Sequence, residues 1–331
     1  MTLMQRLRQT FIAPYKLREL GILGMNGRNV DYIARYNPRH LYPLVDNKLK
    51  TKKAAHKAGI ATPKLLGYVE SFGEVKRLMH RLDPMSDFVV KPTRGSGGKG
   101  IIVIAGRDGE FFVKPSGAKL SALDLRRHIS DIMSGLYSLG GKSDSVMIEQ
   151  RVDFDPVFGD YSFEGVPDIR VIVFRGFPVM AMLRCSTHSS DGRANLHQGA
   201  VGVGIDLHSG HSIHAVQRNH PVHAHPDTEK PFDELRVPDW EKLLLLAARC
   251  YEMTGLGYIG CDIVIDKSLG PLILELNARP GLSIQVANGA GLLPRLKAIE
   301  ALDEEELEWP ADKRVEHARA LFGHTRPIPV V

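Results

Sequence analysis

Hydrophobic and polar positions alternate in two neighbouring stretches near the C-terminal end of the chain. The first runs from Tyr258 to Asp266 and the second begins at Pro271, and both are rich in β-branched and aliphatic residues. Alternation with period two predicts strands, and the intervening residues 267–270 have the composition of a turn. The two stretches are therefore predicted to form a β-hairpin.

The polar positions of this hairpin predict a metal site. Folding the hairpin about its middle places Asp262 opposite Glu275. Residues i and i+2 of a strand share a face, so Glu275 and Asn277 point the same way while Leu274 and Leu276 point into the core. Few carboxylates on one side suit Mg²⁺, with Mn²⁺ as an alternative, held jointly with substrate phosphates. A solvated hairpin face without a ligand is the other interpretation.

The same periodicities elsewhere predict a mixture of helices and strands, and hence an α+β fold. Helices are predicted at 48–59, 72–82, 123–134 and 240–254, and strands at 88–91, 101–105, 146–149, 169–174 and 178–183. The last two strands should form a hairpin. Residues 1–45 predict a helix followed by an irregular arm.

Length and composition narrow the class of protein. The 331 residues, 43% of them hydrophobic, suffice for roughly two domains. The absence of an apolar run near ~18 residues and of a secretory signal predicts a cytoplasmic protein without a membrane span. The net charge of +5 is spread along the chain, which disfavours nucleic acid as a partner and is compatible with anionic small substrates. Three cysteines outside any paired motif are expected to be buried thiols.

A glycine-rich loop lies between two predicted strands. Its G-x-G-x-x-G pattern would have to open a helix in a dinucleotide-binding fold, but here it opens a strand. The backbone N–H groups of Gly95, Gly97 and Gly98 can instead fold over a polyphosphate. Lys91, at the end of the preceding strand, can place its ammonium group on the same phosphates. The alternative is a flexible surface turn.

A histidine-rich stretch at 205–238 invites a zinc interpretation. Its histidines follow neither a zinc-finger nor an H-E-x-x-H spacing, and no cysteine lies nearby. Four prolines in the same stretch favour a β-rich excursion, and a specific metal site is not expected there.

The order of these features resembles the ATP-grasp superfamily. The residues that carry the resemblance are Lys48 on an early helix, Lys91 before a glycine hairpin, 146–152 as a hinge strand, and Asp262, Glu275 and Asn277. Within the superfamily the chain is most similar to the RimK-type α-L-glutamate ligases, at 168–170, 191–200 and 275–281. The resemblance covers 46–300, and the domain that precedes the grasp lobes in RimK-type ligases is replaced here by a short arm, so that the acceptor surface is abbreviated or rebuilt from another chain.

This resemblance implies an ATP-grasp fold in which ATP lies between two lobes. The expected divisions are an N-terminal arm at 1–45, an N-lobe at 46–152, a C-lobe at 153–305 and a C-terminal tail at 306–331. The residues expected to contact the nucleotide are Lys48, Lys91, Gly95, Gly97, Gly98, Glu149, Gln150, Val152, Asp168, Arg193 and Asn195. Among them the lysines would hold phosphates, the hinge would bind adenine, and Asp168 would lie near the ribose.

The chemistry implied by the family is formation of an acyl phosphate on a carboxylate, followed by attack of an amine. Mg²⁺ with Arg170, Arg193 and Arg279 would stabilise the developing charge, and no protein nucleophile is needed. The expected partners are an amino acid such as glutamate, or another carboxylate, and an amine acceptor such as a peptide or small molecule; a homo-oligomer is left open. An ATP-grasp kinase and a non-catalytic nucleotide-binding regulatory module are the alternative functions, and the intact metal residues disfavour the second.

Overall fold

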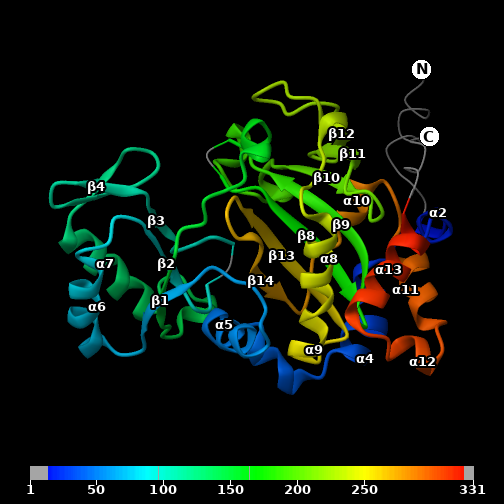
Figure 1. Cartoon of the computed structure of the whole chain (residues 1–331), viewed down its shortest axis with the longest axis horizontal. Helices are drawn as coiled ribbons and strands as arrows, with labels where there is room; N and C mark the ends of the chain where they lie inside the picture. The colour runs from blue at the N-terminus through cyan, green and yellow to red at the C-terminus, as the bar shows by residue number, and fades with distance from the viewer. Residues whose placement is uncertain (1–13, 96, 164, 324–331) are drawn as a thin grey trace.

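The computed structural model describes residues 14–95, 97–163 and 165–323 of the chain. They form two α+β lobes, each built on an antiparallel sheet, with the smaller lobe at the left of Figure 1. This arrangement confirms the predicted fold class. Within the described residues no helix combines the length and the apolar character needed to cross a membrane.

The smaller lobe, called the N-lobe below, contains two helices and two sheets. Its elements are β1 (Leu65–Val69), α6 (Val75–Leu82), β2 (Phe88–Pro92), β3 (Ile102–Ile104), β4 (Gly106–Asp108), β5 (Phe111–Val113), β6 (Lys119–Leu120), α7 (Ala122–Met133) and β7 (Val146–Glu149). The larger sheet has the strand order β1-β7-β2-β3 and the smaller one β4-β5-β6. Residues of α6 and α7 such as Leu82 and Ile129 pack with Phe88 of β2 in one apolar cluster.

The larger lobe, called the C-lobe, is built on a seven-stranded sheet. Its elements are β8 (Asp168–Phe174), β9 (Phe177–Cys185), β10 (Val201–Ile205), β11 (Ser212–Gln217), β12 (His220–Pro221), α8 (Trp240–Ala248), α9 (Cys250–Thr254), β13 (Tyr258–Asp266), β14 (Gly270–Asn277), α10 (Ser283–Asn288), α11 (Leu293–Glu300), α12 (Glu304–Leu307) and α13 (Ala311–Phe322). The strand order is β12-β11-β10-β9-β8-β13-β14. Helix α10 packs on β9 to β11, while α8 and α13 pack on each other and on β9.

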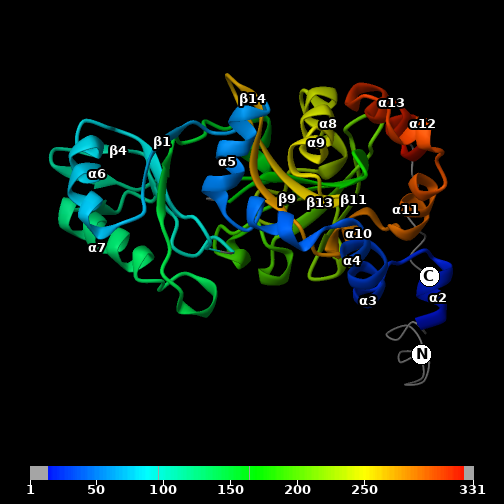
Figure 2. The ribbon, with the colours of Figure 1, turned by 90° about the horizontal axis from the view of Figure 1, so that it is seen from below.

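Helix α5 (Lys48–Lys57) lies between the two lobes, as Figure 2 shows. Its Ala55 belongs to the main core of the C-lobe. At its N-terminus, Lys48 donates its backbone N–H to the carbonyl of Thr93 in the N-lobe at 2.9 Å. The helix begins at Asn47, whose side chain accepts the N–H of Lys50 as an N-cap. One face of α5 is therefore held at the junction of the lobes.

Local sequence signals account for several of these elements. The β8–β9 hairpin turns at Arg175 and Gly176, whose φ angles of 50° and 85° are those of the tight turns that match strand twist. Helix α7 begins with a capping box in which Ser121 and Asp124 satisfy each other's backbone N–H groups. The elements predicted from periodicity, including the helices at 72–82 and 240–254 and the β-rich excursion after 205, are confirmed within a few residues.

The two ends of the chain differ from the prediction. Residues 25–36 are helical rather than irregular, as α3 (Met25–Gly27), a π-helical segment (Arg28–Ile33) and α4 (Ala34–Tyr36). They are preceded by α2 (Pro14–Glu19) and followed by a 3₁₀ segment (Arg39–Leu44). Tyr32 and Tyr36 pack edge-on against Phe174, so tertiary packing stabilises turns too short to be recognised locally.

The segment predicted as a C-terminal tail contains helix α13. Its Val315, Ala318 and Phe322 are buried in the main core of the C-lobe. Residues 1–13 and 324–331 lie outside the described residues. All three cysteines are buried and unbridged, as expected from their spacing.

Candidate functional site

Strands β13 and β14 form the hairpin predicted from alternation. Asp262 lies directly opposite Glu275, as predicted. A bulge follows at once, because Ile263 pairs with Ile273 and Leu274 is left without a partner across the ladder. Leu276 is in the main core, but Leu274 packs with a smaller apolar cluster. The prediction that both leucines enter one core is wrong, since the bulge shifts the period by one residue.

The carboxylate of Asp262 lies in a buried network of four charged side chains. Arg170 donates to it through Nε at 2.7 Å and through Nη2 at 2.6 Å, and Arg184 donates through Nη2 at 2.8 Å. Arg184 also binds Asp168 through two hydrogen bonds, one of them at 2.9 Å. We call Asp168, Arg170, Arg184 and Asp262 the C-lobe charge cluster. It contains two carboxylates and two guanidinium groups and carries no net charge.

The cluster keeps Asp262 ionised. Although burial opposes the charged form, the guanidinium groups of Arg170 and Arg184 hold the pKa of Asp262 well below its usual value. Burial has the opposite outcome for Asp168, whose pKa is raised despite its contact with Arg184. The lowered pKa of Asp262 favours its anionic form, and both of its oxygen atoms accept hydrogen bonds from the two guanidinium groups.

A second buried network lies in the N-lobe. Glu149, at the end of β7, is 2.5 Å from the ammonium nitrogen of Lys91 on β2 and 2.5 Å from that of Lys52 on α5. Lys52 also donates to the carbonyl of Pro63. Lys52, Lys91 and Glu149 form the N-lobe charge cluster, which has two positive groups and one negative group. The structure thus places Glu149, expected to contact a nucleotide, between two lysines.

Lys48 joins the glycine loop to the carboxylate hairpin. Its ammonium nitrogen donates to the carbonyl of Gly95 at 2.7 Å and lies 3.1 Å from Oε1 of Glu275. Gly95 belongs to the N-lobe and Glu275 to the C-lobe. The structure therefore brings together three positions that the sequence places far apart.

The glycine loop forms the predicted hairpin tip between β2 and β3. Its base is anchored by Asp144, which accepts hydrogen bonds from Thr93 Oγ1 at 2.6 Å and from the backbone N–H of Arg94 at 2.9 Å. Gly97 and Gly98 have φ angles of +63° and +75°, and a Cβ at either position would meet open space. These two glycines expose backbone that a side chain at positive φ would strain.

The hinge strand leads into a buried apolar cluster. The backbone N–H of Gln150 donates to the carbonyl of Lys64 at 2.9 Å, so this donor is already engaged. Val152 is buried with Val264 and Leu272, and Leu274 packs against this group. The hinge residues thus lie next to apolar side chains of β13 and β14.

Three other predicted residues lie apart from both charge clusters. The side chain of Arg193 is 58% exposed and lies 3.6 Å from Asp191, while Asn195 accepts a backbone N–H two residues further on. Arg279 pairs with Asp46 at 3.2 Å. The structure does not join these side chains to Asp262, and their roles toward a substrate stay predictions.

The donor atoms of the hairpin are of the type that a hard divalent cation prefers, and a cation at Asp262 would share oxygens that accept from Arg170 and Arg184 in this structure. Asp262 is ionised, Glu275 is 41% exposed with Oε1 facing Lys48, and Asn277 accepts the backbone N–H of Arg279 through its carbonyl oxygen. Carboxylate and amide oxygens are ligands that Mg²⁺ accepts together with phosphates. In the described part of the chain no group of three or more His, Cys, Asp or Glu side chains could hold a metal alone. A cation here would need oxygen atoms from a ligand.

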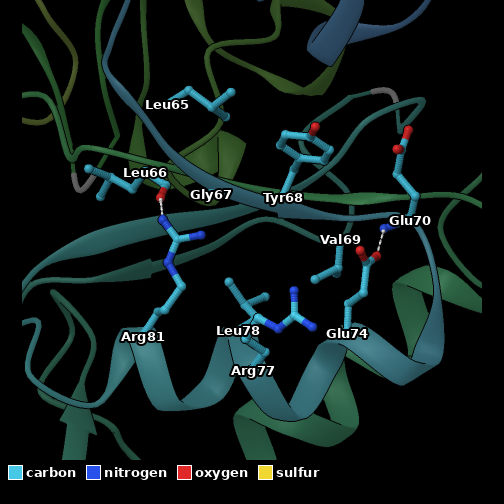
Figure 3. A pocket seen from close by; sticks show the side chains of 10 residues that line it. All are labelled: Leu65, Leu66, Gly67, Tyr68, Val69, Glu70, Glu74, Arg77, Leu78 and Arg81. Carbon is cyan, nitrogen blue, oxygen red and sulfur yellow. Dashed lines mark hydrogen bonds between the residues drawn. The ribbon is translucent and has the colours of Figure 1, made fainter.

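Two hollows lie away from these residues. One of about 440 Å³ lies in the N-lobe between β1 and α6, with Tyr68, Arg77 and Arg81 among its lining residues (Figure 3). The other, of about 610 Å³, lies beside α8, α9 and the start of α13. Neither is lined by a residue predicted for the site.

Sequence reasoning missed Arg184 and Lys52. Arg184 lies directly across the β8–β9 ladder from Asp168, just as Arg170 lies across from Asp262. The predicted hairpin could have revealed the first pair, because opposite charges facing each other across strands stabilise a sheet. Lys52 follows Lys48 by four residues, so both lie on one face of α5.

Comparisons with known proteins identify a family. Residues 27–301 match the model of a family described as sugar-transfer associated ATP-grasp. No match is found among curated proteins. Solved structures similar to this chain include the ATP-grasp ligase PsnB complexed with a minimal precursor, at 16% identity over 80% of this chain and 62% of that one, with a TM-score of 0.41.

Two further solved structures are similar over comparable lengths. The D-alanine–D-alanine ligase from Bacillus anthracis complexed with ATP shares 15% identity over 86% of this chain and 70% of that one, with a TM-score of 0.41. An L-amino acid ligase from Bacillus licheniformis shares 13% identity over 80% and 50%, with a TM-score of 0.43. This chain therefore spans less than two thirds of the PsnB and L-amino acid ligase chains.

Proposed function

Because this chain belongs to the sugar-transfer associated ATP-grasp family, we propose that it is an ATP- and Mg²⁺-dependent ligase that joins a carboxylate to an amine. The observation that carries the proposal is the position of Lys48. Its ammonium group contacts the glycine loop and the carboxylate hairpin at once, at 2.7 and 3.1 Å. A phosphate-binding loop and a metal-binding hairpin must lie this close if one nucleotide is to use both.

The residues present supply positioning and charge for phosphoryl transfer. In the proposed reaction a carboxylate oxygen of the first substrate attacks the γ-phosphorus of ATP, the bond to the β,γ-bridging oxygen breaks, and ADP leaves. Lys48 and Lys91 would hold the phosphates, and Asp262, Glu275 and Asn277 would hold Mg²⁺, which neutralises phosphate charge when bound. In the free protein Lys48 pairs with Glu275. When the nucleotide binds, its phosphates could accept the ammonium group of Lys48, and Mg²⁺ could replace that ammonium group beside Glu275. Neither charged side chain would then lose an oppositely charged partner.

The second step would form the amide. An amine attacks the acyl carbon of the acyl phosphate, phosphate leaves with the bonding electron pair, and the nitrogen loses a proton to solvent or to phosphate. Cations near the tetrahedral intermediate lower its energy, and Arg170, Arg193 and Arg279 are the proposed groups. Arginine suits this task because its fork matches carboxylate and phosphate oxygens.

The substrates are proposed by class. The resemblance of 168–170, 191–200 and 275–281 to RimK-type ligases supports an amino acid such as glutamate as one partner. The description of the family as associated with sugar transfer supports an acceptor that carries a sugar, with an amino or carboxyl group as the point of attachment. A peptide acceptor is the remaining option.

The test combines ADP release with mass spectrometry of the products. The purified protein is incubated with ATP and Mg²⁺ and with pools of amino acids, amino sugars, uronic acids and peptides, singly and in pairs. A ligase releases ADP and phosphate only when an acid and an amine are both present, and the product mass is their sum minus water. A phosphorylated single substrate would identify a kinase instead. Nucleotide binding without ADP release in any pool would favour a regulatory module and overturn the proposal.

A further inference from the structure

The N-lobe charge cluster contains a lysine to which the proposed reaction gives no task. Lys52 is buried, on the inner face of α5, and its ammonium nitrogen is 2.5 Å from Glu149 and also donates to the carbonyl of Pro63. Burying a lysine without a function is expensive, because its charged form loses water. Burial does lower the pKa of Lys52, with Lys91 acting in the same sense and Glu149 against it.

Glu149 faces two ammonium groups and can neutralise only one. The side chains of Glu149, Lys52 and Lys91 are 4%, 9% and 11% exposed, so solvent screens their charges weakly. The two lysines differ in their other contacts. Lys52 is tied to Pro63 at the start of the segment that leads into β1, whereas Lys91 is on β2, which leads directly into the glycine loop.

We propose that Lys52 is a positioning residue that keeps Glu149 neutralised, so that the ammonium group of Lys91 is free to leave Glu149 for a phosphate of the nucleotide. This inference rests on the proposed nucleotide site but not on the ligase reaction. In the free protein Lys91 forms an ion pair with Glu149. When a polyphosphate arrives, Lys91 transfers to it, and the pair of Lys52 and Glu149 remains behind without net charge.

Removing Lys52 should therefore lock Lys91 in place. In Lys52→Met the remaining pair of Lys91 and Glu149 is already neutral, and moving Lys91 would leave an unpaired buried carboxylate, which is strongly unfavourable. We expect the dissociation constant for ATP to rise about ten- to a hundred-fold, the loss of one charge-assisted hydrogen bond. Lys52→Arg should retain most of the affinity, because it keeps the charge beside Glu149.

The double variant Lys52→Met/Glu149→Gln separates this role from packing. With a neutral amide at position 149, nothing retains the Lys91 ammonium, and the cluster has the net charge of the wild type. ATP affinity should then recover to within a few-fold of the wild type. Glu149→Gln alone leaves two buried ammonium groups together and should lower the free energy of unfolding.

The experiment is isothermal titration of each variant with ATP, without acid or amine, alongside urea unfolding to confirm that each is folded. Lys50→Met is the matched control, since Lys50 is an exposed lysine of the same helix. Equal affinity in Lys52→Met and Lys50→Met, or a double variant as weak as Lys52→Met, would overturn the proposal. A wild type that binds no ATP would overturn it together with the nucleotide site, whereas ATP binding without ligation would overturn only the proposed reaction.

Discussion

In the C-lobe charge cluster two carboxylates face two guanidinium groups, whereas in the N-lobe charge cluster one carboxylate faces two ammonium groups. The first cluster is balanced, and each guanidinium group donates to carboxylates through Nε and Nη2, as expected for a scaffold that fixes three adjacent strands and keeps Asp262 ionised. The second has a surplus positive charge in a buried position. Such a surplus is costly unless an anion completes it, and for this reason we propose that the N-lobe cluster binds a phosphate.

Breaking the balanced C-lobe charge cluster should destabilise the protein more than any other single change considered below. Arg184→Met would leave two buried carboxylates with one guanidinium group between them. We expect a loss of about 3–5 kcal/mol in the free energy of unfolding, the cost of breaking a buried ion pair. Urea unfolding measures it, with Arg193→Met as the control, because that exposed side chain should matter by less than about 0.5 kcal/mol. A loss of similar size in both variants would show that the C-lobe cluster is not a scaffold.

Glu275 should behave oppositely to Arg184, since it is a half-exposed carboxylate outside the balanced cluster. Glu275→Gln keeps the size of the side chain but replaces a charged metal ligand with a neutral one. Turnover should fall by roughly 10²–10³, as for other groups that stabilise developing charge, while ATP binding and stability change little. Steady-state ADP release at saturating Mg²⁺ measures this, and near-normal turnover would remove Glu275 from the metal site.

The smallest of these effects is expected from removing the second ammonium group of the N-lobe charge cluster. Lys91→Ala leaves Lys52 and Glu149 as a balanced pair, so it should cost less stability than Arg184→Met. ATP binding should weaken by about 1.5–3 kcal/mol through loss of a charge-assisted contact. Calorimetric titration with ATP, paired with urea unfolding, tests both halves. Unchanged affinity would count against the assignment of the surplus charge to phosphate.

Much of the carboxylate hairpin could be predicted from the sequence, because a period of two residues determines which side chains share a face. The pairing of Asp262 with Glu275 follows from that rule. The bulge after this pair, which moves Leu274 out of the main core, has no comparable signal in residues of uniformly β-forming type. The glycine loop was predictable from a different local signal, because glycine is favoured at positions that require positive φ, as at Gly97 and Gly98.

The residues that make up the two charge clusters were harder to predict from the sequence. Arg170 and Asp262 belong to strands that are adjacent in the sheet but separated by some ninety residues of chain, and the sequence gives no register between them. Nothing in the sequence distinguishes Lys52 from the other lysines of the same basic helix, most of which would be expected to face solvent. Its burial depends on how α5 docks between the lobes, which is decided by tertiary packing around Ala55.

If the glycine loop and the carboxylate hairpin form one nucleotide site joined by Lys48, ATP should stabilise the folded protein through that lysine. Unfolding of the wild type, Lys48→Met and Lys50→Met is followed with and without ATP and Mg²⁺, at a hundred times the dissociation constant measured for the wild type. The wild type and the exposed control Lys50→Met should each gain about 2.7 kcal/mol, and Lys48→Met clearly less. Equal stabilisation of Lys48→Met and Lys50→Met, or none in the wild type, would show that the loop and the hairpin do not form one nucleotide site joined by Lys48.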